Sequence, residues 1–487
     1  MMGFRSRFVL LLCLAALLAV LSLSLQFLHL LPLPAGLYTS DQGKLRKRVL
    51  VDLVIPPSEL DAMYESHRYC NRPNHTVQGL EGHVPPGYHL AGIVVMIRHG
   101  DRYPLSSLPG VAQPDIACDI KPEREPSHHQ LAMFVQHMRK ADLTHLEGAL
   151  ALLSLFPTAR QCETGQLTQT GLVQHIMNGE HLHQAYANHG GLFADEEPPP
   201  LVETTPRSRT LQSAMALLYG LRPMFPWSSM QVRSQASVYY CGIACDCPAR
   251  GFYLERTEQE RMLNRAQAPD AVYKALAELL DLSVAQAKST VSVDPLLALF
   301  CHGQQLPCRH RGCLKSASFR VLRQHQLTEE RKSKRGAMYQ RFALLAMYPM
   351  LNRTAIHLRR IAEGHLAPRL SLCSGHDTTL EPMLNALGIH DAPFPRYAAR
   401  LVFELWRKGP SVGQIESHTI RILYDGEDVT FRTSFCRSRP AHQHCPLRIF
   451  LDFVSSGMLA PFNTSSYQHA CQVPKRALSN LQLNILQ

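Results

Sequence analysis

Two arginines surround one histidine in a short polar segment that reads Arg98-His99-Gly100-Asp101-Arg102. Arginine suits phosphate because its planar guanidinium bonds two phosphate oxygens at once and keeps its charge at any physiological pH. An imidazole with one ring nitrogen bonded to a backbone carbonyl presents the lone pair of its other nitrogen for attack on phosphorus. The segment therefore has the residue types of a phosphoryl-transfer site with a histidine nucleophile.

A second polar segment contains the pair His376-Asp377. Each segment follows a short apolar run, residues 88–97 before the first and 370–373 before the second. Such runs, rich in Val, Ile and Leu, are typical of strands buried inside a sheet. A lone histidine is usually a satisfied core residue. Here, both polar segments lie just past predicted strands, where open α/β sheets bind ligands.

The rest of the chain supplies the elements of an α/β fold. Apolar residues at helical spacing predict helices at 167–189 and 210–221 and a third after Asp377, whereas alternation predicts strands at 401–406 and 419–424. We expect a mainly parallel central sheet flanked by helices. Residues from about 232 to 335 are helical in composition and rich in cysteine, which predicts an inserted, mostly helical cap.

These segments together resemble the histidine acid phosphatase branch of the histidine phosphatase superfamily. The family's pattern Arg-His-Gly-x-Arg-x-Pro is complete at residues 98–104. Residues 166–168 (Gln-Leu-Thr) and 208–211 (Ser-Arg-Thr-Leu) resemble two further family motifs, and His376-Asp377 matches the family's His-Asp pair. The resemblance implies the histidine phosphatase fold.

The resemblance also implies roles for six residues. His99 attacks phosphorus, Asp377 protonates the leaving oxygen, and the phosphoryl group is bound by Arg98, Arg102, Arg209 and His376. A positioned acid speeds such a step by about a hundred- to ten-thousandfold. The alternatives are a solvated helix-terminal arginine at 209 and a helix N-cap at 377. The sequence has no binuclear-metal pattern and no Gly-rich nucleotide loop, so we expect neither a metal nor another cofactor.

The N-terminal residues predict a membrane anchor. Residues 8–31 are uncharged and long enough to span a bilayer, after a short cytoplasmic tail at 1–7. A cleavable signal peptide is the alternative, but the apolar run is longer than usual and no clear cleavage site follows. Residues 32–60 carry prolines and basic residues and read as a lumenal stem before the phosphatase domain at 61–487.

Cysteines and glycosylation signals favour an oxidising lumen. The chain has 14 cysteines, of which 13 lie beyond the predicted anchor, and carries candidate glycosylation sites at Asn74, Asn352 and Asn463. Because 13 is odd, we expect one free thiol and choose Cys373, inside an apolar run. The six cysteines between 241 and 313 lack the usual spacing of zinc ligands, so disulfides are the favoured interpretation.

Within its family, the chain most resembles the enzymes that remove the 2-phosphate from xylose in the linkage region of proteoglycan glycans. That resemblance implies a single-pass type II Golgi protein, with Golgi glycosyltransferases of the same pathway as possible partners. The net charge of +11 suits an anionic partner, but the basic residues are dispersed and no nucleic-acid motif is present. The alternatives are a broad-specificity lumenal acid phosphatase, a phosphoryl transferase and an inactive phosphate- or glycan-binding relative.

Overall fold

The computed structural model describes residues 61–474, apart from short gaps at 74–78, 84–86, 142–143, 145, 190–197, 228–229, 410–412 and 441–443. The predicted tail at 1–7, anchor at 8–31 and stem at 32–60 lie outside the described residues, as does Asn74. Within the described ranges, none of the helices combines the length and the apolarity needed to cross a bilayer.

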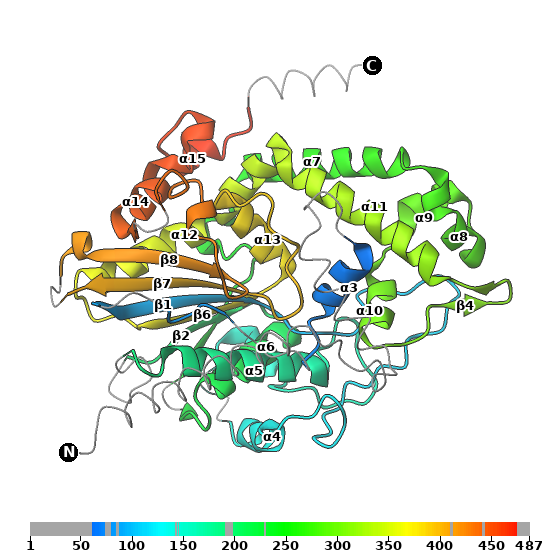
Figure 1. Cartoon of the computed structure of the whole chain (residues 1–487), viewed down its shortest axis with the longest axis horizontal. Coiled ribbons are helices and arrows are strands. Elements are labelled where there is room, and N and C mark those ends of the chain that lie inside the picture. Colours follow the sequence, from blue (N-terminus) through cyan, green and yellow to red (C-terminus); the bar gives the residue numbers. More distant parts are fainter. Residues whose placement is uncertain are drawn as a thin grey trace, which may run out of the picture. The chain divides into compact units, whose positions relative to one another are not determined.

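The central feature is an eight-stranded mixed sheet (Figure 1). Its order is β10-β8-β7-β1-β6-β2-β3, with β9 paired to β8. The strands are β1 (Tyr88–Arg98), β2 (Leu201–Thr204), β3 (Gln231–Ser234), β6 (Leu370–Gly375), β7 (Arg400–Lys408), β8 (His418–Tyr424), β9 (Glu427–Asp428) and β10 (Cys445–Pro446). Strands β1, β6, β2 and β3 are parallel neighbours, whereas β7, β8, β9 and β10 pair antiparallel. The predicted α/β fold is confirmed, with its parallel half at the strands that precede the two polar segments.

Helices cover both faces of the sheet because β1 is buried on both sides. Ile93, Val95 and Ile97 of β1 belong to one hydrophobic cluster, and Val94 and Met96 belong to another. The first cluster includes side chains of α4 (Leu131–Arg139), α5 (Gln169–Tyr186) and α6 (Ser208–Leu221); the second includes those of α12 (Ala337–Ala362), α13 (Asp377–Ala386) and α14 (Leu447–Asp452). The helices predicted from apolar spacing at 167–189 and 210–221 are therefore confirmed as α5 and α6. The helix predicted after Asp377 is confirmed as α13, which begins at Asp377 itself.

A group of helices lies beyond the carboxyl ends of the parallel strands (Figure 1). These cap helices are α7 (Pro248–Ala266), α8 (Asp270–Leu280), α9 (Val284–Thr290), α10 (Asp294–Cys301) and α11 (Ser316–Arg335), with the short hairpin β4 (Cys308–Arg309) and β5 (Gly312–Cys313). Helices α8 to α11 share a third hydrophobic cluster with Tyr69 of α3 (Ala62–Cys70) and with Tyr397. The cap thus has a core of its own, which continues to residues beside the polar segments.

Six disulfides tie the described chain together. The pairs are Cys70–Cys301, Cys118–Cys162, Cys241–Cys245, Cys247–Cys471, Cys308–Cys313 and Cys436–Cys445. Cys373 in β6 is free and buried, as the odd count and its apolar run predicted. The disulfide interpretation of the six cysteines between 241 and 313 is also confirmed.

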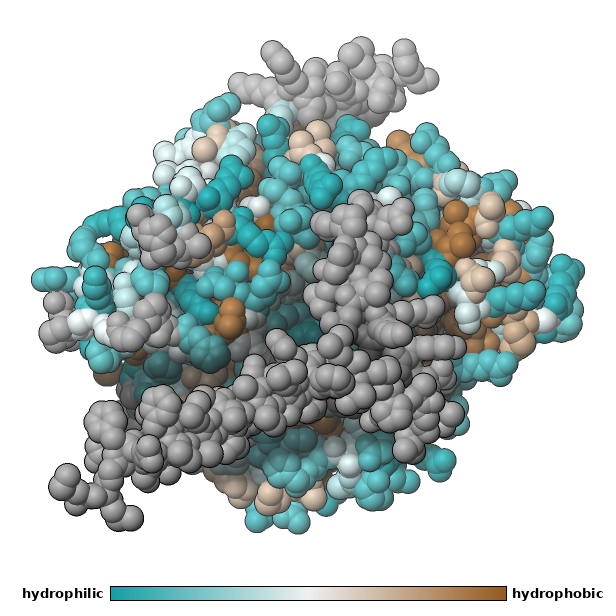
Figure 2. All heavy atoms as spheres, viewed as in Figure 1, coloured by the Kyte–Doolittle hydropathy of each residue, from teal (hydrophilic) through white to brown (hydrophobic). Residues whose placement is uncertain are grey.

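The face of the molecule shown in Figure 2 is mostly hydrophilic where its residues are described. Figure 2 shows hydrophobic side chains in small separate groups, several of them over the cap helices. Asn463 is exposed and Asn352 is half-buried on α12, so each of these two glycosylation candidates has some access to solvent.

Candidate active site

The ring of His99 is fixed where β1 ends. Its Nδ1 lies 2.9 Å from the carbonyl oxygen of Gly100, and because a carbonyl only accepts, Nδ1 carries the proton and Nε2 keeps its lone pair. The side chain is buried, and the backbone N–H of His99 donates to Gly375 at the end of β6. This is the arrangement that a nucleophilic histidine requires.

Helix α5 holds the segment that follows His99. A Cβ added to Gly100 would lie 2.4 Å from the backbone oxygen of Gly171, so glycine is needed at Gly100 for the segment to pack against α5. The Asp101 carboxylate accepts from the hydroxyl of Thr168 at 2.6 Å, and the Asp101 N–H donates to the side chain of Gln174 at 2.8 Å. Gly100 therefore makes room for the close approach of a helix.

Arg98 is fully buried among aromatic rings. Its guanidinium lies over the rings of Tyr69 and Tyr397, at 4.9 and 4.6 Å from their centroids. One terminal nitrogen donates to the hydroxyl of Tyr69 at 3.0 Å and pairs with Asp377 at 2.8 Å, and the other donates to the carbonyl of Pro395 at 2.7 Å. Cation–π contacts and a carboxylate together offset the cost of burying this charge.

The second polar segment meets the first at this edge of the sheet. The rings of His99 and His376 lie edge to face, 5.5 Å apart. His376 is the N-cap residue of α13, and its Nε2 lies 2.9 Å from the hydroxyl of Thr205. Asp377 is the first residue of α13, so its interpretation as the N-cap is wrong by one position.

Arg209 is the second residue of α6 and is partly buried. Burial and the neighbouring guanidiniums of Arg102 and Arg207 lower its pKa to about 10. Its proximity to Arg102, Arg98 and Asp377, evident in the same shift, places it at the same edge of the sheet. Its partial burial and its positive neighbours distinguish Arg209 from a solvated helix-terminal arginine.

The charges around His99 keep its imidazole neutral. Burial, followed by the positive charges of Arg98 and Arg209, lowers the pKa of His99 well below its ordinary value. Burial and Arg209 lower the pKa of His376 to about 4. Burial opposes ionisation of Asp377, but Arg98 and Arg102 outweigh it and lower the pKa of that carboxyl. Without a bound anion, the site therefore holds a neutral nucleophile beside an ionised Asp377.

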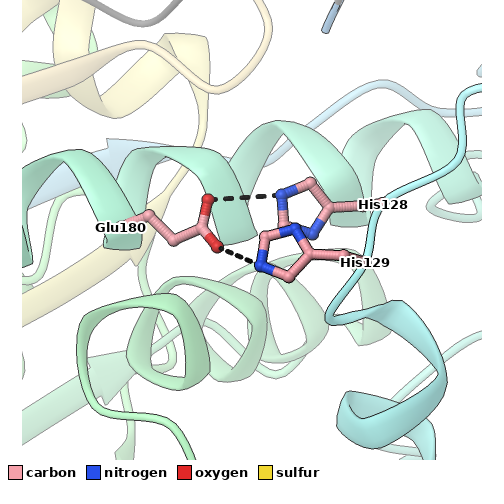
Figure 3. Close-up of side chains that lie close together, drawn as sticks. All are labelled: His128, His129 and Glu180. Carbon is pink, nitrogen blue, oxygen red and sulfur yellow. Dashed lines mark ion pairs between the residues drawn. The ribbon is translucent and has the colours of Figure 1, made fainter.

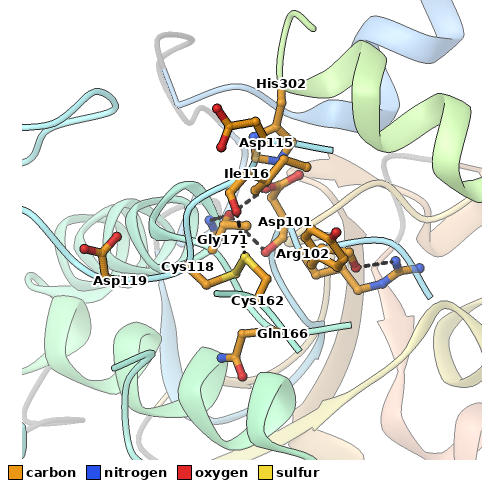
Figure 4. Close-up of a disulfide and its surroundings, with 12 residues drawn as sticks. Asp101, Arg102, Asp115, Ile116, Cys118, Asp119, Cys162, Gln166, Gly171 and His302 are labelled. Atoms are coloured by element: carbon orange, nitrogen blue, oxygen red, sulfur yellow. Dashed lines mark hydrogen bonds and ion pairs between the residues drawn. A yellow bond between two sulfur atoms is a disulfide. The ribbon is translucent and has the colours of Figure 1, made fainter. Parts of the chain in front are cut away.

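Helix α10 of the cap contacts the catalytic segment at both of its ends. Asp294, its first residue, holds both terminal nitrogens of Arg102, at 2.8 and 3.3 Å. His302, just past its last residue, pairs with Asp101 at 2.8 Å, an interaction shown in Figure 4. The disulfide between Cys301 and Cys70 adds a covalent tie at the same end of α10.

The structure brings together all six predicted site residues and adds others that the sequence did not indicate. The additions are Tyr69, Asp101, Thr168, Gln174, His175, Thr205, Asp294, His302 and Tyr397. Asp101 lay inside the recognised segment, and Thr168 lay in a stretch that resembled a family motif. Asp294 and His302 carried no local signal, because their partners are far away along the chain.

His175 makes the stability of this site sensitive to pH. Its Nε2 lies 3.0 Å from the carbonyl oxygen of Arg98, and burial lowers its pKa to about 3. Below the ordinary histidine pKa of about 6.5, the unfolded chain takes up a proton that the folded chain refuses, so stability falls as pH falls. The shift corresponds to about 2 kcal/mol lost between about pH 7.5 and about pH 5.

We predict that the His175→Gln variant loses about 2 kcal/mol less unfolding free energy than the wild type over that pH interval. Glutamine keeps a donor for the Arg98 carbonyl but has no proton to bind. Urea unfolding of both chains at the two pH values measures the difference. Equal losses in the two chains would contradict the assignment.

The chain is similar to known proteins over the stretches that contain the predicted site residues. The model of the histidine phosphatase superfamily (branch 2) matches residues 89–282 and 324–425, more than half of the chain. 2-Phosphoxylose phosphatase 1 from Danio rerio is 43% identical over 96% of this chain and 98% of its own length. The protein of the same name from Homo sapiens is 40% identical over 96% and 99%.

Among solved structures, the phytase from D. castellii matches with a TM-score of 0.49 and 15% identity, over 90% of this chain and 93% of that one.

The family match leaves out residues 283–323, which contain α10 with Asp294 and His302. Its two matched stretches include all six predicted site residues. The chain belongs to branch 2 of the histidine phosphatase superfamily.

Proposed function

We propose that this chain hydrolyses phosphate monoesters through a phosphohistidine on His99, and that its substrate is the 2-phosphate of xylose. The observation that carries the reaction is the ring of His99. It is held by the Gly100 carbonyl with Nε2 unprotonated, and the charges of Arg98 and Arg209 help lower its pKa. His99 lies within the first stretch that the family model matches, which supports this proposal.

In the first step, Nε2 of His99 forms a bond to phosphorus as the bond from phosphorus to the ester oxygen breaks. Arg98, Arg102, Arg209 and His376 stabilise the charge on the other phosphoryl oxygens. Asp377 gives its proton to the leaving oxygen, which departs as an alcohol. In the second step, water attacks phosphorus, returns a proton to Asp377 and frees the imidazole.

Asp377 must hold a proton for the first step, although Arg98 and Arg102 lower its pKa in the free protein. A bound phosphate carries up to two negative charges and competes for the same guanidiniums. Both effects favour the protonated carboxyl and raise the pKa of Asp377 in the complex. Substrate binding thereby favours the protonated form of Asp377, and mildly acidic conditions favour that form further.

The substrate proposal is supported by relatives whose printed name is 2-phosphoxylose phosphatase 1, at 40 to 43% identity over 96% of this chain. We extend it to xylose in the linkage region of proteoglycan glycans and to a Golgi membrane location. Six disulfides and the apolar run at 8–31 support a type II protein with a lumenal catalytic domain. Glycosyltransferases of the same pathway are the partners that fit this location.

We predict that the Asp377→Asn variant loses more activity toward a substrate with a poor leaving group than toward one with a good leaving group. Release of the alcohol from a sugar phosphate in the first turnover, where the alkoxide leaves poorly, slows by about a hundred- to ten-thousandfold. Release of 4-nitrophenolate from 4-nitrophenyl phosphate in the first turnover, where the phenolate leaves without a proton, slows by less than about tenfold. Later turnovers of both substrates also need Asp377, as the base of the second step.

First-turnover rates of leaving-group release from the two substrates measure this difference. The His99→Ala variant should release no phosphate from either, and Asp391→Asn, which changes an exposed carboxylate paired with Arg432, should match the wild type. Equal losses with both substrates in Asp377→Asn would rule out its role as the acid. Activity retained in His99→Ala would rule out the phosphohistidine.

The substrate assignment predicts a preference for phosphoxylose in its glycan. We expect kcat/KM for a linkage-region oligosaccharide carrying xylose 2-phosphate to exceed that for 4-nitrophenyl phosphate by at least about a hundredfold, because hydrogen bonds to sugar hydroxyls discriminate strongly. Phosphate release by the purified full chain measures both. Equal kcat/KM values for the two substrates would overturn the substrate assignment but not the proposed phosphatase activity.

Asp294 gives a further prediction because it occupies the guanidinium fork of Arg102. In Asp294→Asn the negative charge is lost, so Arg102 attracts an anion more strongly. We expect the inhibition constant of inorganic phosphate to fall about fivefold, equivalent to ~1 kcal/mol.

The matched control is Asp270→Asn, which removes the first carboxylate of α8 and its pair with Lys288. It should leave the inhibition constant unchanged. A rise in the constant for Asp294→Asn would mean that Asp294 holds Arg102 in place for phosphate and does not compete with it.

A further inference from the structure

Two adjacent histidines and a glutamate meet at the surface, outside the two catalytic segments. His128 and His129 precede α4, and Glu180 lies on α5 (Figure 3). Nε2 of His128 lies 3.2 Å from one carboxylate oxygen, and Nε2 of His129 lies 3.6 Å from the other. One ligand atom from each residue falls within 4.8 Å of the other two.

We propose that His128, His129 and Glu180 form a binding site for a divalent transition-metal ion of the Zn²⁺ type. Imidazole nitrogen and carboxylate oxygen bind Zn²⁺ at about 2.0 to 2.2 Å. Two such ligands in a tetrahedron lie about 3.4 Å apart. The two contacts to Glu180, at 3.2 and 3.6 Å, bracket that spacing but reach different carboxylate oxygens. Since the three ligand atoms lie within 4.8 Å of one another, side-chain rotation can bring them to the spacing that an ion requires.

The charges of the three groups favour a metal over two ion pairs. The rings of His128 and His129 lie 4.5 Å apart, so protonating both would place two like charges side by side. With both imidazoles neutral, two lone pairs and one carboxylate converge. A divalent cation satisfies all three, whereas Mg²⁺ and Ca²⁺ prefer sites made of oxygen alone.

Binding at Nε2 has a small cost at the opposite side of His128. The N–H of Gln130 lies 3.3 Å from Nδ1 of His128, and a ring that ligates through Nε2 carries its proton on Nδ1. This long contact is lost when the ion binds. His129 is 73% exposed and turns without disturbing the core.

The site joins two segments that also support the catalytic turn. The segment before His128 is held at the start of α5, where the side chain of Gln169 accepts from Lys121 N–H at 2.8 Å and donates to the Pro126 carbonyl at 3.1 Å. Its beginning is fixed by the disulfide between Cys118 and Cys162, which Figure 4 shows. A metal at Glu180 would fix its end, farther along the same helix.

Three protein ligands leave one coordination position for water. Glu180 lies nine residues beyond Gly171, which is about 13 Å along α5 from the contact with Gly100. The ion therefore acts on the fold and takes no part in the attack by His99. Zinc should raise thermal stability without being required for phosphate release.

The test measures Zn²⁺ binding to the purified full chain by equilibrium dialysis at about pH 7.5, where imidazole is mostly neutral. The variants are His129→Ala, which alters an exposed side chain, and Glu180→Gln, which keeps the shape of the carboxylate. We expect each variant to bind one zinc ion fewer per chain, or to bind it at least tenfold more weakly. Zinc should raise the Tm of the wild type by at least about 2 °C and that of the variants by less.

The matched control is His365→Ala, which removes a histidine that is also exposed and lies 3.5 Å from a glutamate, Glu363. It should bind zinc as the wild type does, and Mg²⁺ should shift the Tm of none of the chains. All variants should retain the wild-type rate with 4-nitrophenyl phosphate. Identical zinc stoichiometry and affinity in the wild type, His129→Ala and Glu180→Gln would overturn the proposed site.

Discussion

Three guanidinium groups crowd around one imidazole at the edge of the sheet, and their mutual repulsion must be offset before any substrate arrives. The positive charge of Arg98 is balanced by Asp377 and by two aromatic rings, and the charge of Arg102 is balanced by Asp294. For Arg209, burial and its positive neighbours outweigh the attraction of Asp377 and lower the pKa to about 10. The unbalanced charge is what attracts a phosphate, and the balanced charges are what let the protein fold around it.

The sequence predicted those parts of the site that lie within one stretch of chain. His99 follows a buried strand, and His376 and Asp377 follow another, so strand patterns were enough to locate both polar segments. Parallel pairing of β1 with β6 then brings the two segments together, with Arg98 in register with Gly375. The short strands β2 and β3, of four residues each, have too little alternation to be recognised, although β2 leads to Arg209.

What the sequence could not predict depends on contacts across long stretches of chain. Asp294 is an ordinary acidic residue at the start of a helix, and nothing beside it indicates Arg102. His302 is likewise recognised only through its contact with Asp101. Burial lowers the pKa of His302, but the carboxylate of Asp101 outweighs burial and raises it. The same holds for His128, His129 and Glu180, which are brought together by packing of the chain before α4 against α5. Cys373 was the exception, because parity and its apolar setting were local information.

Helix α10 links the cap to the reaction because its two ends contact Asp101 and Arg102, the two residues that follow Gly100. Movement of α10 would therefore move the catalytic segment itself, whose other side is fixed by the close backbone approach of Gly100 and Gly171. Helix α10 lies outside the residues matched by the family model, whereas the six predicted site residues lie inside them. In the proposed reaction, the six residues act on the phosphoryl group and the leaving oxygen. Selectivity for the rest of the alcohol must then arise from other groups around the site.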